Sequence, residues 1–370
     1  MLVANSKTEN DFPELEECIN NTLKFLHDVQ NQEISNLGAP FELGKENALD
    51  LAYETVDLIR AHATKLSLLV LNPPFISSAF LKTLCELTES LIPSLVHAVN
   101  LCRPTEYTLL FSREIKYRAT QIIIAFTSLI KTIPLEKQIL SEKSLEGKIV
   151  LAKTGIIWES CDAIKRLKRI GIDGYLIGIT QNYIDLIKDA SEELQEWAKE
   201  EGFDERQIAT EEKNFELDTL SAKLDESEAI PKCTSSDDVD KIQQRFQVAR
   251  NKLRLLVLMF QATIKRRLKT LPSLPQNQLE KSKNELDRIA IVKVLDHVLD
   301  MMKVISNLID DLAGSFYDFD IQKIDEEMKE CFSMGSRVAE LLADNWEGKP
   351  DGFSAWASYN LSIIISCAIC

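Results

Sequence analysis

Histidine and carboxylate side chains are the groups that could hold a metal ion or perform acid–base chemistry in this chain. The four histidines lie far apart and none has the spacing of a metal-binding motif. They are His27, His62, His97 and His297. His62 and His97 fall in amphipathic stretches, where we expect hydrogen-bonded bundle residues. Paired carboxylates such as Asp310 and Asp311 lie in helical stretches, where solvent or a lysine can satisfy them. We therefore expect no catalytic residue, no cofactor and no metal.

Glycine and cysteine motifs offer no stronger site. The sequence has no GxxxxGK[ST], GxGxxG or GxSxG motif, and Gly171-Ile-Asp-Gly174 reads as a joint between helices. Cys367-Ala-Ile-Cys370 is a CxxC pair, but neither a helix start nor a second pair accompanies it. The same four residues fit a prenylation motif at Cys367, although cysteine is an unusual last residue and no polybasic segment precedes it.

The most unusual charged feature is a basic run from Arg245 to Lys269. It contains eight basic residues and no acidic ones, and apolar residues interleave at helical spacing. The eight are Arg245, Arg250, Lys252, Arg254, Lys265, Arg266, Arg267 and Lys269. One interpretation is a docking face for an acidic partner protein. The other is a bundle helix whose basic side pairs with the acidic stretch just before it.

Helices must position all of these residues, because hydrophobic periodicity is helical throughout and strand signals are nearly absent. Prolines separate the periodic segments, for example at Asn72-Pro73-Pro74, and Pro93 predicts a kink inside one of them. The predicted helices span about residues 12–32, 46–71, 77–102, 106–131, 145–170, 176–199, 239–270, 277–312 and 321–344. Long helices with short joints predict an all-α fold of antiparallel multi-helix bundles.

Composition predicts the domain organisation. Between Asp189 and Asp240 there are 18 acidic and 5 basic residues, which is typical of a solvated helix end followed by a partly disordered linker. We therefore predict an N-terminal bundle over residues 1–200, an acidic linker over 201–240 and a C-terminal helical domain over 241–346. Residues 347–370 form an apolar tail that is either a docking segment or a poorly ordered end.

Charge and cysteine usage limit the compartment and the partners. The formal net charge of −15 disfavours binding to nucleic acid, so direct contact with DNA or RNA is not expected. The eight cysteines are scattered, as expected of reduced, buried side chains in a cytosolic or nuclear protein. No signal peptide or membrane-spanning run is apparent, so we expect a soluble protein without a transmembrane segment.

Several helical segments, in their order along the chain, resemble the cyclin-D-interacting (Grap-and-cyclin-D-interacting) protein family. They are His62–Pro74, Trp158–Asp162, Thr180–Leu194, Val248–Arg254 and Ile309–Tyr317, with the acidic stretch after the third. The resemblance covers about residues 45 to 345 and rests on packing patterns, so it brings no catalytic residue with it.

The resemblance implies a two-part helical protein, distantly vinculin-like, in cytoplasm and nucleus. It further implies a non-enzymatic regulator that restrains cell-cycle progression by binding cyclins or helix-loop-helix transcription factors. A vinculin-like cytoskeletal or adhesion adaptor is the alternative that long bundled helices favour.

Overall fold

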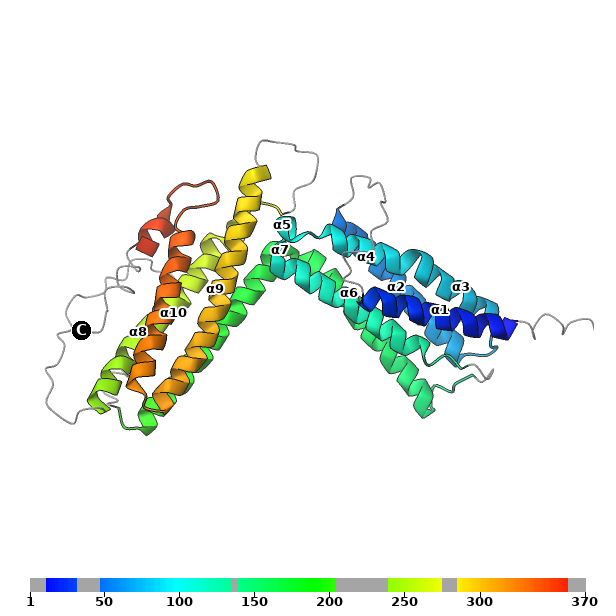
Figure 1. The fold of residues 1–370 in the computed structure, drawn as a ribbon, viewed down its shortest axis with the longest axis horizontal. Coiled ribbons are helices and arrows are strands. Elements are labelled where there is room, and N and C mark those ends of the chain that lie inside the picture. The colour runs from blue at the N-terminus through cyan, green and yellow to red at the C-terminus, as the bar shows by residue number, and fades with distance from the viewer. Residues whose placement is uncertain (1–10, 32–46, 135–138, 204–238, 275–284, 359–370) are drawn as a thin grey trace, which may run out of the picture. The chain divides into compact units, whose positions relative to one another are not determined.

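The computed structural model describes residues 11–31, 47–134, 139–203, 239–274 and 285–358, and these residues fold into helices without any strand (Figure 1). This confirms the all-α prediction. A vinculin-like arrangement is not confirmed. Two compact units divide the chain: one combines residues 1–175 and 273–296, and the other combines 176–272 and 297–370.

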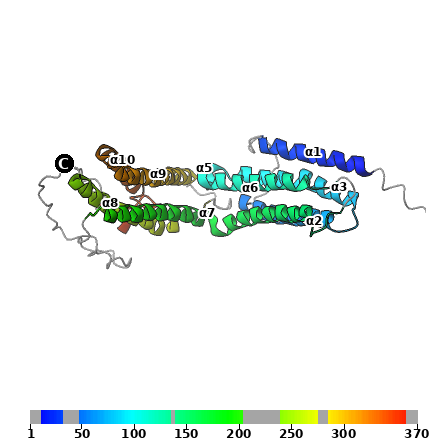
Figure 2. The same ribbon diagram turned by 90° about the horizontal axis from the view of Figure 1, so that it is seen from below.

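The first unit is built mainly from α1 (Asp11–Asn31), α2 (Ala48–Leu71), α3 (Ser77–Glu86), α4 (Ile92–Leu101) and α6 (Leu109–Ile130), with the first part of α7 (Leu145–Glu200). α1 packs on α3 and α6 (Figure 2). α2 packs on α4. One apolar side of each helix faces the core. On α2, for example, Ala52, Val56, Ile59 and Ala63 recur every three or four residues and are fully buried.

The predicted kink at Pro93 takes the form of a π-helical turn, Leu87–Leu91, between α3 and α4. Pro93 lies in the first turn of α4. A proline has no N–H to donate and its ring clashes with the preceding turn, so the regular ladder cannot continue through it. A short helix, α5 (Pro104–Tyr107), follows the next proline joint before α6 begins.

α2 and α7 run antiparallel in the first unit. Ser67 contacts Thr154, Arg60 pairs with Asp162, and Lys168 pairs with Asp50. Residue numbers along α7 therefore rise as those of the contacted residues along α2 fall. The predicted joint in α7 is confirmed, because two helical segments meet there at a kink. The helix is interrupted only at Gly171, which has φ 70° and ψ −178°, and continues through Gly174 to Glu200.

The second unit contains the rest of α7 with α8 (Val239–Arg266), the 3₁₀ turn η3 (Leu268–Thr270), most of α9 (Glu285–Tyr317) and α10 (Ile321–Leu341). Trp197 near the end of α7 packs against Phe316 at the end of α9, which contacts Phe246 near the start of α8. Consecutive helices in this unit therefore run in opposite directions, as an antiparallel bundle requires.

The compact units are discontinuous in sequence, whereas composition had predicted continuous domains over residues 1–200 and 241–346. The difference arises because α7 and α9 each contribute to both units: the boundaries fall after Tyr175 in α7 and after Asp296 in α9. Most of the predicted acidic linker lies outside the described residues, so its partial disorder stays a prediction.

Candidate partner-binding surfaces

The predicted basic run falls on α8 and η3, but its eight side chains do not share one exposed face. Three of them, Arg250, Lys252 and Arg267, are buried. The cause is that α8 buries a wide sector of its surface. Phe246 touches Phe316 on α9, and Leu256 meets Gly335 on α10, so the helix packs on more than one neighbour. Leu253, Leu256 and Phe260 are core residues, as their spacing predicted.

Arg245 and Lys252 are engaged with α10. Arg245 donates from Nε and Nη2 to the two carboxylate oxygens of Asp325, at 2.7 and 2.8 Å. Lys252 Nζ lies 5.1 Å from the centre of the Phe332 ring, in a cation–π contact. Arg254 is half-buried. Arg245 and Lys252 therefore hold α8 in its bundle and offer little to a partner.

Arg267 is an internal anchor with no exposed surface. Its guanidinium donates to both carboxylate oxygens of Asp351, at 2.8 and 3.1 Å, and to the carbonyls of Leu342 and Ala343, at 2.8 and 2.9 Å. It also lies over the Phe353 ring. The hydrogen bond from Arg267 lowers the pKa of Asp351 to about 2. Arg267 therefore fixes the end of α10 and the first part of the predicted tail, whose residues 352–358 are helical.

Lys265, Arg266 and Lys269 remain as the exposed part of the basic run. They sit at the C-terminal end of α8 and in η3, where positive charge is favourable next to the helix dipole. We call these three residues the α8 cationic end. Among the eight residues of the predicted basic run, these three are the exposed ones, and their partner binding stays a prediction.

A second exposed surface was missed by the sequence analysis. On the first part of α7, Leu145, Ile149 and Ile156 are 71%, 40% and 53% exposed, and Ala152 between them is exposed as well. Steps of four, three and four residues place all four on one line along a helix. We call them the α7 stripe. Val150, Ile157 and Ile164 form a second apolar line, which is buried.

The same helix is held to α2 by charged and aromatic contacts. Arg60 pairs with Asp162 and lies 5.1 Å from the ring centre of Trp158, while Trp158 Nε1 donates to Thr64 Oγ1 at 3.2 Å. Lys165 pairs with Asp57. These contacts fix the rotation of α7 about its axis. They therefore determine that the α7 stripe faces outward and the other apolar line inward.

His62, one of the remaining chemical candidates, has structural partners. His62 contacts Glu86 through Nε2 at 2.8 Å and the Leu58 carbonyl through Nδ1 at 2.9 Å, as expected of a satisfied bundle histidine. In the described part of the chain, no group of three or more His, Cys, Asp or Glu residues could hold a metal. No described helix is long and apolar enough to cross a membrane. Cys367 and Cys370 lie outside the described residues.

The helices and these surfaces define an all-helical bundle protein. Residues 53–200 match the sequence model described as Grap2 and cyclin-D-interacting, N-terminal, which confirms the resemblance over that segment. A cyclin-D1-binding protein 1 homolog from Xenopus laevis is 31% identical over 136 residues, 36% of this chain and 38% of that protein. An uncharacterized protein from Schizosaccharomyces pombe is 23% identical over 359 residues, 95% of each chain. The α7 stripe lies within the matched segment.

Proposed function

We propose that this chain is a non-enzymatic regulator that binds a D-type cyclin or a helix-loop-helix transcription factor and thereby restrains cell-cycle progression. The observation that carries the proposal is the match of residues 53–200 to the cyclin-D-interacting family. The Xenopus relative is named for binding cyclin D1, which supports the same partner class.

The α7 stripe is the surface in the matched segment best suited to such a partner. Its leucine and isoleucine side chains are large, apolar and open to solvent, and they repeat at the spacing with which one helix packs against another. An amphipathic helix of the partner would bury them and remove apolar area from water. That gain is about 25 cal/mol per Å² of apolar surface.

The α8 cationic end offers a contact of different chemistry, for an acidic surface. Lys265, Arg266 and Lys269 are exposed in a chain whose net charge is −15. Because the rest of the protein repels anions on average, such a cluster favours a local acidic patch over a long polyanion. This contact would add mainly to the association rate and would weaken as salt rises.

A binding titration between the purified full chain and a purified D-type cyclin tests the proposed surface. Ile156→Asp, in the α7 stripe, is expected to weaken binding at least about tenfold, because it places a charge in an apolar contact. Leu151→Asp is the matched control: Leu151 is 47% exposed but lies on another side of α7, so this variant should bind within about twofold of wild type. Equal losses in both variants would reject the α7 stripe as the interface.

The proposal also includes residence in both cytoplasm and nucleus, which imaging of the tagged chain in its native cells would check. Co-sedimentation with actin filaments, together with no measurable cyclin binding, would instead favour the cytoskeletal alternative. A turnover reaction abolished by a single substitution would contradict the non-enzymatic role.

A further inference from the structure

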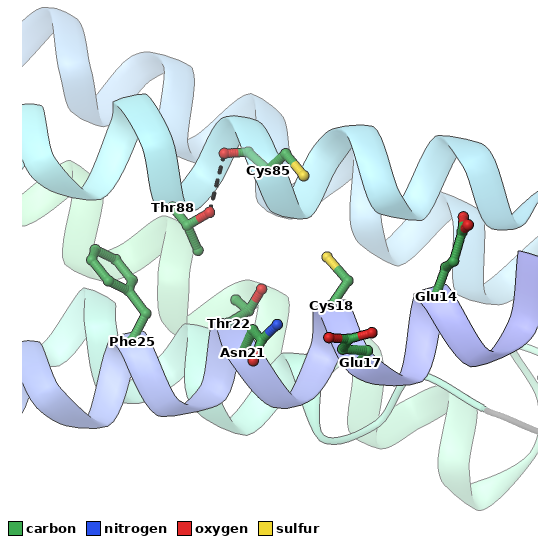
Figure 3. Close-up of a pocket in the computed structure, with 8 residues that line it drawn as sticks. All are labelled: Glu14, Glu17, Cys18, Asn21, Thr22, Phe25, Cys85 and Thr88. Atoms are coloured by element: carbon green, nitrogen blue, oxygen red, sulfur yellow. Dashed lines mark hydrogen bonds between the residues drawn. The ribbon is translucent and has the colours of Figure 1, made fainter.

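Two cysteine side chains face each other across the groove between α1 and α3 (Figure 3). Cys18 projects from α1 and Cys85 from α3, and both line one open cavity of about 450 Å³. The two side chains point toward each other across this cavity. Cysteines on two helices that face each other across one groove can form a disulfide if the sulfur atoms approach to the S–S bond length of about 2.05 Å.

Solvent can reach this pair, in contrast to the other cysteines of the described chain. Cys85 is exposed and Cys18 is half-buried, whereas Cys102, Cys161 and Cys331 are buried. Burial raises the pKa of each of these three thiols to about 12. A thiol reacts as its thiolate and must be reached by its reaction partner, so these three are protected from exchange. The sequence expectation of uniformly buried cysteines is wrong for Cys18 and Cys85.

The groove sets the order in which the two thiols would react. Burial and the neighbouring Cys85 raise the pKa of the Cys18 thiol, although a hydrogen bond with Thr22 opposes this effect. Cys85 is therefore the better first nucleophile, because it is the more open of the two. Cys18 is then positioned to attack it from the opposite helix.

We propose that Cys18 and Cys85 form a reversible disulfide site, oxidised by a small-molecule disulfide, that ties α1 covalently to α3. The Cys85 thiolate attacks one sulfur of the small disulfide, whose S–S bond breaks and releases one small thiol. The Cys18 thiolate then attacks the Cys85 sulfur of the mixed disulfide and releases the second small thiol. Two electrons pass from the protein to the small disulfide, and both protein thiol protons end on the released thiols.

The disulfide would change how α1 is held. In the reduced protein, α1 contacts α3 and α6 through apolar packing of Leu15, Ile19, Leu26 and Val29. α1 also lies outside residues 53–200, the segment that matches the family. A covalent link would stop α1 from separating from that segment while the disulfide lasts.

The test uses the full chain equilibrated with mixtures of reduced and oxidised glutathione, then quenched by alkylation and mapped by peptide mass spectrometry. We expect the Cys18–Cys85 disulfide to exceed every other pairing of the five described cysteines at least tenfold. Cys18→Ser should stop at a glutathione adduct on Cys85, and Cys85→Ser should slow any adduct on Cys18 at least tenfold. Circular dichroism checks that both variants remain folded.

Hydrogen exchange supplies a second readout. Oxidation should slow amide exchange in residues 11–31 at least tenfold, and added dithiothreitol should restore the original rate. The proposal is overturned if wild-type Cys18 and Cys85 both remain open to alkylation, if the reaction stops at mixed disulfides, or if exchange in α1 does not change.

Discussion

The Arg267 side chain alone links several segments of the second unit. Its neighbour Arg266 is exposed, while Arg267 is fully buried and its donors satisfy Asp351 and the carbonyls of Leu342 and Ala343. The indole of Trp346 donates to the Arg267 carbonyl at 2.8 Å, which closes the same cluster from the other side. A charge with this many fixed partners is a structural element of the second unit.

Arg267→Met is therefore expected to destabilise the protein by about 3 kcal/mol, because it leaves buried carbonyl groups and one carboxylate without their donor. Urea unfolding followed by tryptophan fluorescence measures the change in free energy. Lys265→Met is the control on the same helix; it removes an exposed charge and should change stability by less than about 0.5 kcal/mol. Similar losses for the two variants would contradict the assigned role.

The Arg267–Asp351 pair also predicts a pH dependence. The pKa of Asp351 is lowered from 3.8 to about 2 in the folded protein, chiefly by the hydrogen bond from Arg267. The folded state thus favours the carboxylate, and its stabilising effect is complete above the unfolded pKa and is lost as pH falls toward about 2. The difference in unfolding free energy between wild type and Asp351→Asn should be constant from pH 7 to about 5 and then shrink. A difference that grows on acidification would contradict this prediction.

The sequence could predict the basic run but not which of its side chains are buried and which are exposed. Arg250, Lys252 and Arg267 are buried, while Lys265, Arg266 and Lys269 are exposed. Periodicity gives the direction of a residue around one helix, but burial also depends on how many neighbours the helix has. Asp325 and Asp351, which pair with Arg245 and Arg267, are about 80 residues away in the chain.

At the scale of the element, Gly171 shows where a helix needs glycine. Its φ of 70° with ψ of −178° lies in a region that side-chain-bearing residues rarely adopt. Gly171→Ala should cost about 1–3 kcal/mol. Gly155→Ala is the control in the same helix and unit, since a Cβ there meets nothing within 4 Å; it should be neutral or stabilise by up to about 1 kcal/mol. Thermal unfolding measures the change in stability of both variants. Equal changes would contradict the argument that Gly171 is required for its backbone conformation.

The contact between α8 and α10 depends on a second glycine. A Cβ on Gly335 would lie 2.5 Å from Leu256 Cδ2, so alanine cannot enter without moving a fully buried leucine. Gly335→Ala should destabilise by about 1 kcal/mol, the cost of overpacking less the gain in helix propensity. In a Leu256→Ala background the clash is absent, and the same substitution should stabilise by up to about 1 kcal/mol. Chemical denaturation of wild type, the two single variants and the double variant measures the coupling free energy between the two substitutions. A coupling near zero would show that the contact is not tight.

Helix positions were largely predictable because prolines and hydrophobic spacing are local signals. The prediction from 46 to 71 became α2, Ala48–Leu71, and the prediction from 321 to 344 became α10, Ile321–Leu341. The continuation of α7 past Gly174 was not predictable, because a glycine inside a helix costs only about 1 kcal/mol, which packing can offset. The apolar line of α7 that faces outward could not be distinguished from the buried one, since both have helical spacing.

At the scale of the whole molecule, the sequence established the all-helical class but not the division into units. Domain boundaries were predicted from composition, which detects acidic stretches. The compact units instead share α7 and α9, and their boundary in α7, after Tyr175, lies next to the predicted glycine joint and not at an acidic stretch. The proposed function has a similar limit: the family match covers residues 53–200, and surface exposure decides which residues within it can meet a partner.

The most direct test of the proposed function is the dissociation constant of the full chain for a purified D-type cyclin, measured at low and at physiological salt. We predict saturable binding with a Kd in the micromolar range or tighter, about −8 kcal/mol. Binding should be weaker at the higher salt, and charge reversal of Lys265, Arg266 and Lys269 together should remove most of that salt dependence. No saturable binding at either salt concentration would contradict the assignment of a cyclin-type partner.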